Sequence, residues 1–423
     1  MTTSDDWYKR RRYLHFDLPI SESSAAAIAK NPEIVARHAF YPLIRFVITS
    51  RKVKWEPGLK RLVTSPKERP VSYASHVDSH IYAYYASLID EKYEAYLKDF
   101  QYQEAVLAFR KLGKSNIHFA KDAFSAIKSM GDSDVITADI SDFFGNLDHQ
   151  LLKSAWCSIL GLKKLPPDHY NVFRSLTKFS WVDRRNLYST LGISHNNPRN
   201  FGARICEPEE FRKVVRGCKL IQSNSDPRGI PQGSPISALL SNIYMTRFDE
   251  AMWSAVSASG GKYFRYCDDM LIIVPKGRGK DYLELTRQLT DLYKLPLHPK
   301  KTEERVFTRT ANGLTADKAL QYLGFMFDGE RIILRSASLA RYSDRMRRGV
   351  RLARATMRSR NNLRIERGEA PIPLRKRKLY KRYSYLGRRN FVSYALRAAD
   401  ILGTNSIKRQ VKPLWKRLRK QMG

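Results

Sequence analysis

Two adjacent aspartates, Asp268 and Asp269, are the residues of this sequence that most directly suggest chemistry. They follow Tyr266-Cys267 and stand between the apolar stretches 262–264 and 270–274. This pattern predicts a strand, a tight turn and a second strand. Turns often carry Asp, so the pair alone is weak evidence of a site. Two like charges at a hairpin tip repel each other, however, and a divalent cation that prefers oxygen ligands, such as Mg²⁺, would relieve the repulsion.

A third carboxylate, Asp139, ends another predicted strand. Residues 134–140 alternate as a strand does, and residues typical of a helix start follow from Ser141. An isolated acid at a strand end is more often a cap or a surface charge than a ligand. If the two strand ends are neighbours in one sheet, Asp139 converges with Asp268 and Asp269. Two metal ions held there can activate a 3′-hydroxyl and stabilise a leaving pyrophosphate, which is nucleotidyl transfer.

A glycine-containing segment, residues 228–235 (RGIPQGSP), lies between these acidic segments. Ser234 is expected to cap a helix that runs from residue 236 to about 255. Gly233 lets the backbone approach a ligand closely, and Gln232 offers an amide at the same place. Alone, a turn followed by a helix is ordinary structure. Between two sets of candidate metal ligands, it predicts the floor of a pocket for a nucleotide and its template base.

The charge of the chain indicates a polyanionic partner. The 76 Lys and Arg residues outnumber the 41 Asp and Glu residues, which gives a net charge of +35. Residues 331–423 hold 28 basic and 4 acidic residues, hence +24 of that total. Nucleic acid is the leading candidate partner, and a solvated basic face or an RNA-binding tail is the alternative. Three basic helices are expected there, over 337–367, from 375 onward and over 406–420.

Other sequence features predict a cytoplasmic protein with no membrane partner. The four cysteines have no zinc-site spacing, which favours reduced thiols. No apolar stretch approaches the length of a membrane span, and the N-terminal residues do not resemble a signal peptide.

Several ordered motifs resemble those of reverse transcriptases of the bacterial, group II intron-like lineage. The resemblance covers roughly residues 60–330 and rests on TADISDFF (137–144), GIPQGSPISALLSNIYM (229–245), YCDD (266–269), LPLHPKKT (295–302), QYLGF (321–325) and SPKERPV (65–71). His298 stands where the family commonly has Asn. Any one motif is weak evidence, but their shared order makes accidental similarity improbable.

The resemblance implies a catalytic centre with two metal ions. Asp139, Asp268 and Asp269 match the carboxylates that bind both ions, and Ile140 would contribute its backbone carbonyl. The expected ions are Mg²⁺, with Mn²⁺ as a substitute. Lys301 matches a lysine that protonates pyrophosphate, and a solvated charge is the alternative for it.

The resemblance also implies which residues bind substrates. Lys67 and Arg69 match basic side chains that contact the triphosphate. Phe144 matches the bulky side chain that excludes a 2′-hydroxyl, although either it or Phe143 could instead be a core aromatic. The remaining matches are Gln232 and Gly233 for the nucleotide pocket, Tyr322, Leu323 and Gly324 for the primer grip, and Arg375, Lys376, Arg377 and Lys378 for nucleic-acid binding.

The expected fold is α+β, the right-hand polymerase with fingers, an antiparallel palm sheet with helices, and a helical thumb. The expected divisions are an N-terminal extension (1–60), fingers (61–133), palm (134–335, with a fingers-type insertion at about 160–225) and a basic thumb (336–423).

The implied function is RNA-directed DNA synthesis. The chain ends after the thumb, without maturase or nuclease extensions, and is most similar to the compact antiphage defence group. Its expected partners are a structured noncoding RNA encoded nearby as template, deoxynucleoside triphosphates and a DNA product. The alternatives are an intron maturase-like splicing protein and an RNA-binding scaffold with a vestigial site.

Overall fold

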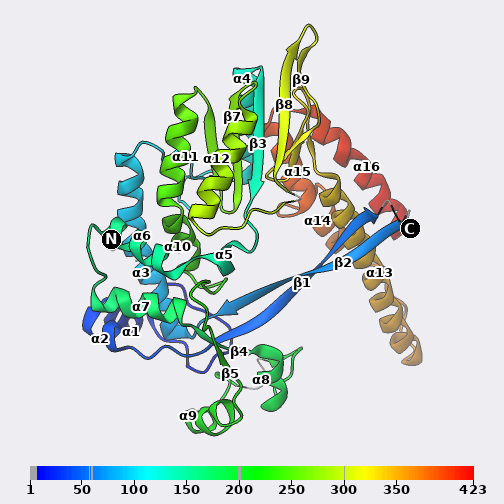
Figure 1. The fold of residues 1–423 in the computed structure, drawn as a ribbon. Coiled ribbons are helices and arrows are strands. Elements are labelled where there is room, and N and C mark those ends of the chain that lie inside the picture. Colours follow the sequence, from blue (N-terminus) through cyan, green and yellow to red (C-terminus); the bar gives the residue numbers. More distant parts are fainter. Residues whose placement is uncertain (1–6, 57, 59–60, 199–201, 300) are drawn as a thin grey trace, which may run out of the picture.

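The computed structural model describes residues 7–56, 58, 61–198, 202–299 and 301–423. Helices and mostly antiparallel strands alternate along these residues, so the predicted α+β class is confirmed. Figure 1 shows a central body, a long two-stranded hairpin that runs out from it, and a group of C-terminal helices on one side.

A five-stranded antiparallel sheet of order β6-β7-β3-β8-β9 lies at the centre of the molecule. Its strands are β3 (Ser133–Asp139), β6 (Lys262–Tyr266), β7 (Asp269–Pro275), β8 (Glu303–Thr310) and β9 (Gly313–Ala316). The strand predicted before Asp139 and the hairpin predicted around Cys267 are therefore both present, and they are adjacent in the sheet.

Both faces of this sheet are covered, because successive side chains of a strand point to opposite faces. In β7, Met270 and Ile272 belong to one hydrophobic core, whereas Leu271 and Ile273 belong to a second core. The first core contains residues of α3 (His76–Asp99), α6 (His149–Leu160), α7 (Pro167–Thr177), α10 (Ser237–Tyr244), α11 (Thr246–Ala258) and α12 (Gly279–Leu292). The second contains α4 (Asn116–Met130) and the C-terminal elements.

The fingers sheet has the order β2-β1-β4-β5. Its strands are β1 (Leu43–Glu56), β2 (Arg61–Tyr73), β4 (Ser180–Asp183) and β5 (Ile221–Ser223). The hairpin of β1 and β2, which pair along their whole length, extends across the expected division after residue 60. Strand β4 pairs in parallel with β1, so the insertion at 160–225 completes the sheet that this hairpin begins.

The remaining helices outside the C-terminal region are short. They are α1 (Glu22–Ala29), α2 (Pro32–Arg37), α5 (Phe143–Asn146), α8 (Arg184–Thr190), α9 (Pro208–Glu210) and a π-helix (Phe211–Arg216). Asp17 holds the N-terminal segment against α3, since its carboxylate accepts hydrogen bonds from the backbone N–H groups of His76 and Val77, both at 2.9 Å. Parts of the expected N-terminal extension, residues 1–6, 57 and 59–60, lie outside the described residues.

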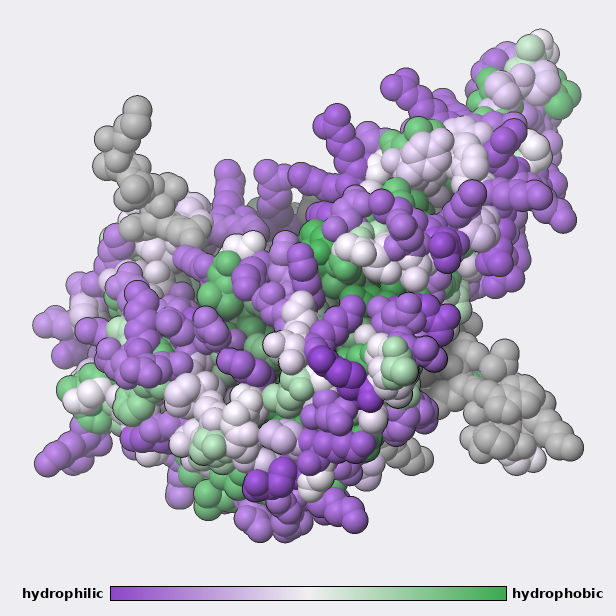
Figure 2. Space-filling model, turned by 90° about the horizontal axis from the view of Figure 1, so that it is seen from above, coloured by the Kyte–Doolittle hydropathy of each residue, from purple (hydrophilic) through white to green (hydrophobic). Residues whose placement is uncertain are grey.

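The C-terminal region has four helices rather than the three that were expected. They are α13 (Ser336–Glu366), α14 (Lys376–Tyr383), α15 (Phe391–Ile401) and α16 (Asn405–Met422), and they follow a small sheet of β10 (Leu320–Tyr322), β11 (Phe325–Phe327) and β12 (Ile332–Leu334). The face of the molecule drawn in Figure 2 is predominantly hydrophilic among the coloured residues. No helix in the described part of the chain is long and apolar enough to cross a membrane.

Candidate active site

The three aspartates converge at one end of the central sheet. Asp139, the last residue of β3, lies directly opposite Asp269, the first residue of β7. The backbone N–H of Ile140 donates to the carbonyl oxygen of Asp268 at 3.2 Å, which fixes the turn against the end of β3. Burial, together with the negative charges of Asp268 and Asp139, raises the pKa of Asp269 to about 7. This concentration of negative charge favours a cation.

The carboxylates suit a divalent metal ion chemically, because they are hard oxygen donors whose mutual repulsion a cation would relieve. Within the described residues, however, no group of three His, Cys, Asp or Glu side chains forms a ready metal-binding arrangement. Asp139 is 7% exposed and its Oδ1 atom pairs with the Nζ atom of Lys301. Binding through Asp139 therefore requires this ammonium group to move. The backbone of Ile140 lies at the same strand end.

Lys301 lies at the carboxylates rather than in open solvent. The segment before it is tied to the end of β3, since Ser141 N–H donates to the Pro296 carbonyl oxygen and His298 N–H to the Asp139 carbonyl oxygen, both at 2.8 Å. These backbone hydrogen bonds hold the ammonium group of Lys301 beside Asp139. Lys300, its neighbour in the motif, lies outside the described residues.

Two cations of β2 lie beside the same site. Lys67 is half-buried, and its pKa is lowered by burial and by the positive charges of Arg69 and Lys301, while Asp139 and Asp268 act in the opposite direction. Arg69, two residues along the strand, is exposed. Residues two apart share a face of a strand, so both cations are available to a polyphosphate at the carboxylates.

The segment 228–235 is held by the fingers, and its helix begins later than predicted. Ser72 N–H donates to the carbonyl oxygen of Gln232 at 2.8 Å, while the Gln232 side chain is exposed. Gly233 has φ +112°, and a Cβ there would lie 2.5 Å from the Ser72 carbonyl oxygen. The close approach that this glycine permits is thus to strand β2 of the chain itself.

Ser234 does not cap the helix, which corrects the prediction. Helix α10 starts at Ser237, and the buried hydroxyl of Ser234 has no hydrogen-bond partner among the described atoms. The Ser237 hydroxyl instead donates to the Pro231 carbonyl oxygen at 2.7 Å. The predicted single helix to residue 255 is divided at Met245 into α10 and α11.

The two adjacent phenylalanines have different environments. Phe143 is 4% exposed and belongs to the first core, whereas Phe144 is only partly buried at its edge. The backbone N–H of Ile230 donates to the Phe144 carbonyl oxygen at 2.9 Å, so α5 is fixed beside the 228–235 segment. Phe143 is therefore the core ring, whereas the Phe144 ring is partly exposed beside the 228–235 segment.

The expected primer-grip residues form the hairpin between β10 and β11. Tyr322 is 3% exposed and its side chain belongs to the second core. Leu323 and Gly324, with φ +45° and +95°, form the turn. The Asn116 amide donates to the Leu323 carbonyl oxygen at 3.1 Å and to the Tyr394 hydroxyl at 2.9 Å. Asn116 thus joins this turn to α4 and to thumb helix α15.

The expected nucleic-acid-binding cations stand at the start of α14. Arg375, Lys376, Arg377 and Lys378 are all exposed. The Lys376 ammonium donates to the carbonyl oxygen of Gly423 at 2.9 Å. This contact joins α14 to the end of α16.

A buried ion pair that the sequence motifs do not predict lies beneath the turn. Arg265 and Asp249 have fully buried side chains, and the guanidinium binds both carboxylate oxygens of Asp249, at 2.7 and 2.5 Å. Arg265 also donates to the carbonyl oxygen of Cys267 at 3.0 Å. An arginine at a position of β6 that points the same way as the buried Tyr263 is the signal that could have revealed it.

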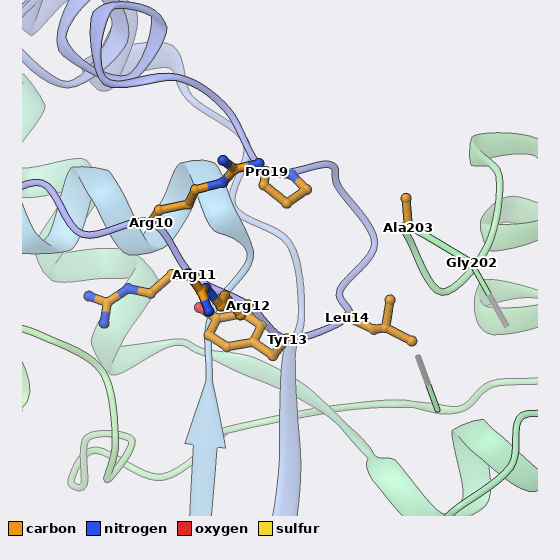
Figure 3. A pocket seen from close by; sticks show the side chains of 8 residues that line it. All are labelled: Arg10, Arg11, Arg12, Tyr13, Leu14, Pro19, Gly202 and Ala203. Atoms are coloured by element: carbon orange, nitrogen blue, oxygen red, sulfur yellow. The ribbon is translucent and has the colours of Figure 1, made fainter. Parts of the chain in front are cut away.

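A cavity of about 490 Å³ lies at the N-terminal segment, away from the candidate catalytic residues. It is lined by Arg10, Arg11, Arg12, Tyr13, Leu14, Pro19, Gly202 and Ala203. In Figure 3 the Arg10 side chain extends toward Pro19, whereas that of Arg11 extends to the opposite side. None of the residues expected to bind substrate lines this cavity.

Comparison with known proteins identifies the family. Residues 67–327 match the family model described as reverse transcriptase (RNA-dependent DNA polymerase). A search of curated protein sequences finds no significant match.

Similar solved structures include three of yeast telomerase. Apo telomerase from Candida tropicalis truncated from its C-terminal domain is 9% identical, with a TM-score of 0.39 and coverage of 75% of this chain and 61% of that chain. Another apo structure of telomerase from Candida tropicalis has 12% identity, a TM-score of 0.37 and coverage of 73% of this chain and 53% of that chain. Telomerase from Candida albicans, in complex with a TWJ fragment of telomeric RNA, has 12% identity, a TM-score of 0.39 and coverage of 94% and 60%.

The present chain therefore spans less than two thirds of the length of each of these telomerase chains. The family model, by contrast, matches more than half of this chain and includes the ends of β3 and β7, where the three aspartates converge. The chain belongs to the reverse transcriptase (RNA-dependent DNA polymerase) family.

Proposed function

We propose that the protein is an RNA-directed DNA polymerase that uses divalent metal ions for nucleotidyl transfer. The observation that carries this proposal is the position of Asp139 directly opposite Asp269, with Asp268 in the adjoining turn. Members of this family generally use divalent metals. Two such ions, when bound, would activate the primer 3′-hydroxyl and neutralise the leaving pyrophosphate.

The residues around the carboxylates have complementary roles in this proposal. Asp139, Asp268 and Asp269 hold the ions. Lys67 and Arg69 bind the triphosphate, which places its α-phosphate in line with the primer. After displacement from Asp139, the ammonium of Lys301 donates a proton to the leaving pyrophosphate.

The decisive experiment is primer extension on an RNA template. Purified protein with Mg²⁺ and deoxynucleotides should make DNA, and Asp268→Ala should abolish the product while the protein stays folded. Asp281→Ala is the matched control, because Asp281 is an exposed aspartate of α12 that pairs with the exposed Arg278. DNA synthesis by Asp268→Ala at the wild-type rate would overturn the assignment.

We further propose that the enzyme acts in the bacterial cytoplasm by copying a structured noncoding RNA encoded nearby, in defence against phage. The similarity of its motifs to those of compact defence-associated reverse transcriptases supports this role. Cells with the gene and its flanking noncoding DNA should resist some phage, and Asp269→Ala should remove that resistance. Resistance that survives Asp269→Ala would favour an RNA-binding scaffold, and a splicing defect as the only phenotype would favour a maturase.

A further inference from the structure

One tyrosine of the thumb is exposed, although the two residues that precede it are buried. Tyr383 is 3% exposed and belongs to the second core, whereas Tyr385 is 55% exposed and the following Leu386 is 57% exposed. These two side chains stand in residues 384–390, the segment between α14 and α15, which we call the thumb loop. Tyr385 does not belong to the second hydrophobic core, which contains Tyr383.

Hydrogen bonds from one side chain make the thumb loop rigid. The Asn390 amide donates to the carbonyl oxygens of Lys381, Ser384 and Gly387 at 3.1, 2.7 and 3.2 Å. Its Oδ1 atom accepts from the first backbone N–H groups of α15. A Cβ at Gly387 would lie 1.8 Å from the Lys381 carbonyl oxygen, so only glycine fits there. The loop therefore presents its exposed side chains in a fixed position.

Tyr385 lies beside other aromatic rings. Its ring centroid is 5.2 Å from that of Trp415 on α16, and Trp415 is also 5.2 Å from Tyr380 on α14. Tyr380 and Trp415 are partly exposed. Elements separated in the sequence thus supply one aromatic cluster, held by the loop on one side and by two helices on the other.

Basic residues surround this cluster. Lys381, Arg382, Arg388 and Arg389 flank it in the sequence of α14 and the thumb loop, and all four are exposed. On α16, Lys412 lies one helical turn before Trp415 and Lys416 follows it directly, and both are exposed. Within the described part of the chain, the structure shows no ion pair for any of these six cations. Because these positive charges are not neutralised by ion pairs, they favour a polyanionic partner over an uncharged one.

We propose that Tyr385, with Leu386 and Trp415, is a stacking platform for unpaired nucleotides of the RNA partner, and that the surrounding cations bind the phosphates of the same strand. Unpaired bases offer free faces for stacking on aromatic rings, whereas bases within a duplex do not. The inference rests on the proposed use of an RNA template and adds a binding site for it outside the catalytic carboxylates.

The test is RNA binding by the full chain without deoxynucleotides or divalent metal, measured by fluorescence anisotropy. The probes are a 12-nucleotide unstructured RNA and a blunt RNA duplex of equal length. Tyr385→Ala should weaken binding of the single strand about tenfold and leave duplex binding unchanged. Tyr385→Phe, which keeps the ring, should bind as the wild type does.

The dependence on salt separates stacking from phosphate binding. Tyr385→Ala should retain the wild-type slope of affinity against salt, whereas Lys412→Gln should make the slope for the single strand shallower by ~0.7. Wild-type affinity of Tyr385→Ala for the single strand, or an equal loss for the single strand and the duplex, would overturn the proposal. Thermal melting should be unchanged in Tyr385→Ala, because the side chain is largely exposed.

The RNA-binding test of Tyr385 does not depend on whether the protein synthesises DNA. A wild-type protein that binds the single strand through Tyr385 but makes no DNA would contradict only the proposed polymerase function. A protein that makes DNA but does not lose affinity in Tyr385→Ala would contradict only the platform.

Discussion

The guanidinium of Arg265 donates a hydrogen bond to the carbonyl oxygen of Cys267, the residue that precedes the paired aspartates. Cys267 has φ +60°, a left-handed conformation that costs about 1–3 kcal/mol for a residue with a side chain. The buried pair of Arg265 and Asp249 thus stabilises the strained turn from within the core. The positions of Asp268 and Asp269 therefore depend on the positive charge of Arg265, a side chain that is fully buried.

This relationship predicts a large effect of a conservative change. Arg265→Lys keeps a positive charge opposite Asp249 but cannot bind both of its oxygens and the Cys267 carbonyl group. The free energy of unfolding should fall by about 1.5–3 kcal/mol, the range for lost hydrogen bonds to charged groups. Urea denaturation measures it. Arg287→Lys, in an exposed pair with Glu284, should change stability by less than about 0.5 kcal/mol. A stability of Arg265→Lys equal to that of the wild type would contradict the role of the pair.

Lys301→Gln should separate metal binding from catalysis. Because Lys301 pairs with Asp139, its removal leaves that carboxylate free, and affinity for Mn²⁺ should rise about two- to fivefold, the equivalent of a partly exposed ion pair. The rate of nucleotide incorporation should nevertheless fall. Mn²⁺ titration followed by electron paramagnetic resonance checks the first effect. Lys294→Gln is the control, because Lys294 pairs with the non-catalytic Asp148. Unchanged Mn²⁺ affinity would show that Lys301 does not compete for the site.

Phe144→Ala should increase ribonucleotide incorporation with little loss of stability, because the ring is only partly buried beside the 228–235 segment. Phe143→Ala should instead lower the free energy of unfolding by about 3–5 kcal/mol, because its ring is part of the core. Two measurements distinguish Phe144→Ala from Phe143→Ala. The ratio of ribonucleotide to deoxynucleotide incorporation reports sugar selection, and thermal melting reports stability. Sugar discrimination that depends on Phe143 and not on Phe144 would place the gate one residue earlier.

The basic start of α14 should make duplex binding depend on salt. If six or more phosphates are contacted, affinity should fall ~10³-fold or more between ~50 and ~200 mM salt. Reversing the charges of Arg375, Lys376, Arg377 and Lys378 should make that dependence shallower. Filter binding of a primer–template duplex measures it. An affinity that does not change with salt would mean that these exposed cations face only solvent.

A buried histidine should make folding sensitive to mild acid. Burial, with a smaller contribution from His76, lowers the pKa of His15 to about 3, and its Nδ1 atom accepts a hydrogen bond from Phe16 N–H. Below pH ~6.5 the unfolded chain binds the proton and the folded chain does not, so stability falls as the pH is lowered toward the folded pKa. Above pH ~6.5, His15 is neutral in both the folded and the unfolded chain, so it does not make stability depend on pH.

The expected loss due to His15 is about 2 kcal/mol between pH 6.5 and pH 5. His15→Asn retains an acceptor but does not titrate, so its stability should change less over this interval. Denaturant midpoints at both pH values provide the comparison, and the exposed His195→Asn serves as the control. Parallel stability curves for His15→Asn and the wild type would contradict the prediction.

The carboxylate centre could be predicted from the sequence because its signals are local. The alternation before Asp139 and the apolar strands around Asp268 and Asp269 are visible in single short segments, and antiparallel pairing of two such strands brings their ends together. Which phenylalanine is in the core could not be predicted, since both are apolar and adjacent. Only the position of α5 against the rest of the palm distinguishes Phe143 from Phe144.

Other features depend on contacts between distant segments. Ser234 has the residue type of a helix cap, but strand β2 binds the preceding Gln232 carbonyl group, and the helix then begins at Ser237. The interruption between α14 and α15 depends on the Asn390 side chain. Its hydrogen bonds to three carbonyl oxygens cannot be predicted from a helical sequence pattern. The pair of Arg265 and Asp249 likewise joins β6 to α11 through side chains alone.

The parallel pairing of β4 with β1 has a consequence for biosynthesis. The edge of β1 that receives Trp181 and Val182 leaves the ribosome long before those residues do. During that interval the fingers hairpin has an unpaired edge, and unpaired strand edges promote association between chains. The nascent protein therefore passes through a vulnerable stage that ends only when β4, which ends at Asp183, has been synthesised and has paired with β1. Slow translation across 74–179 should prolong that stage, whereas slow translation well after Asp183 should not.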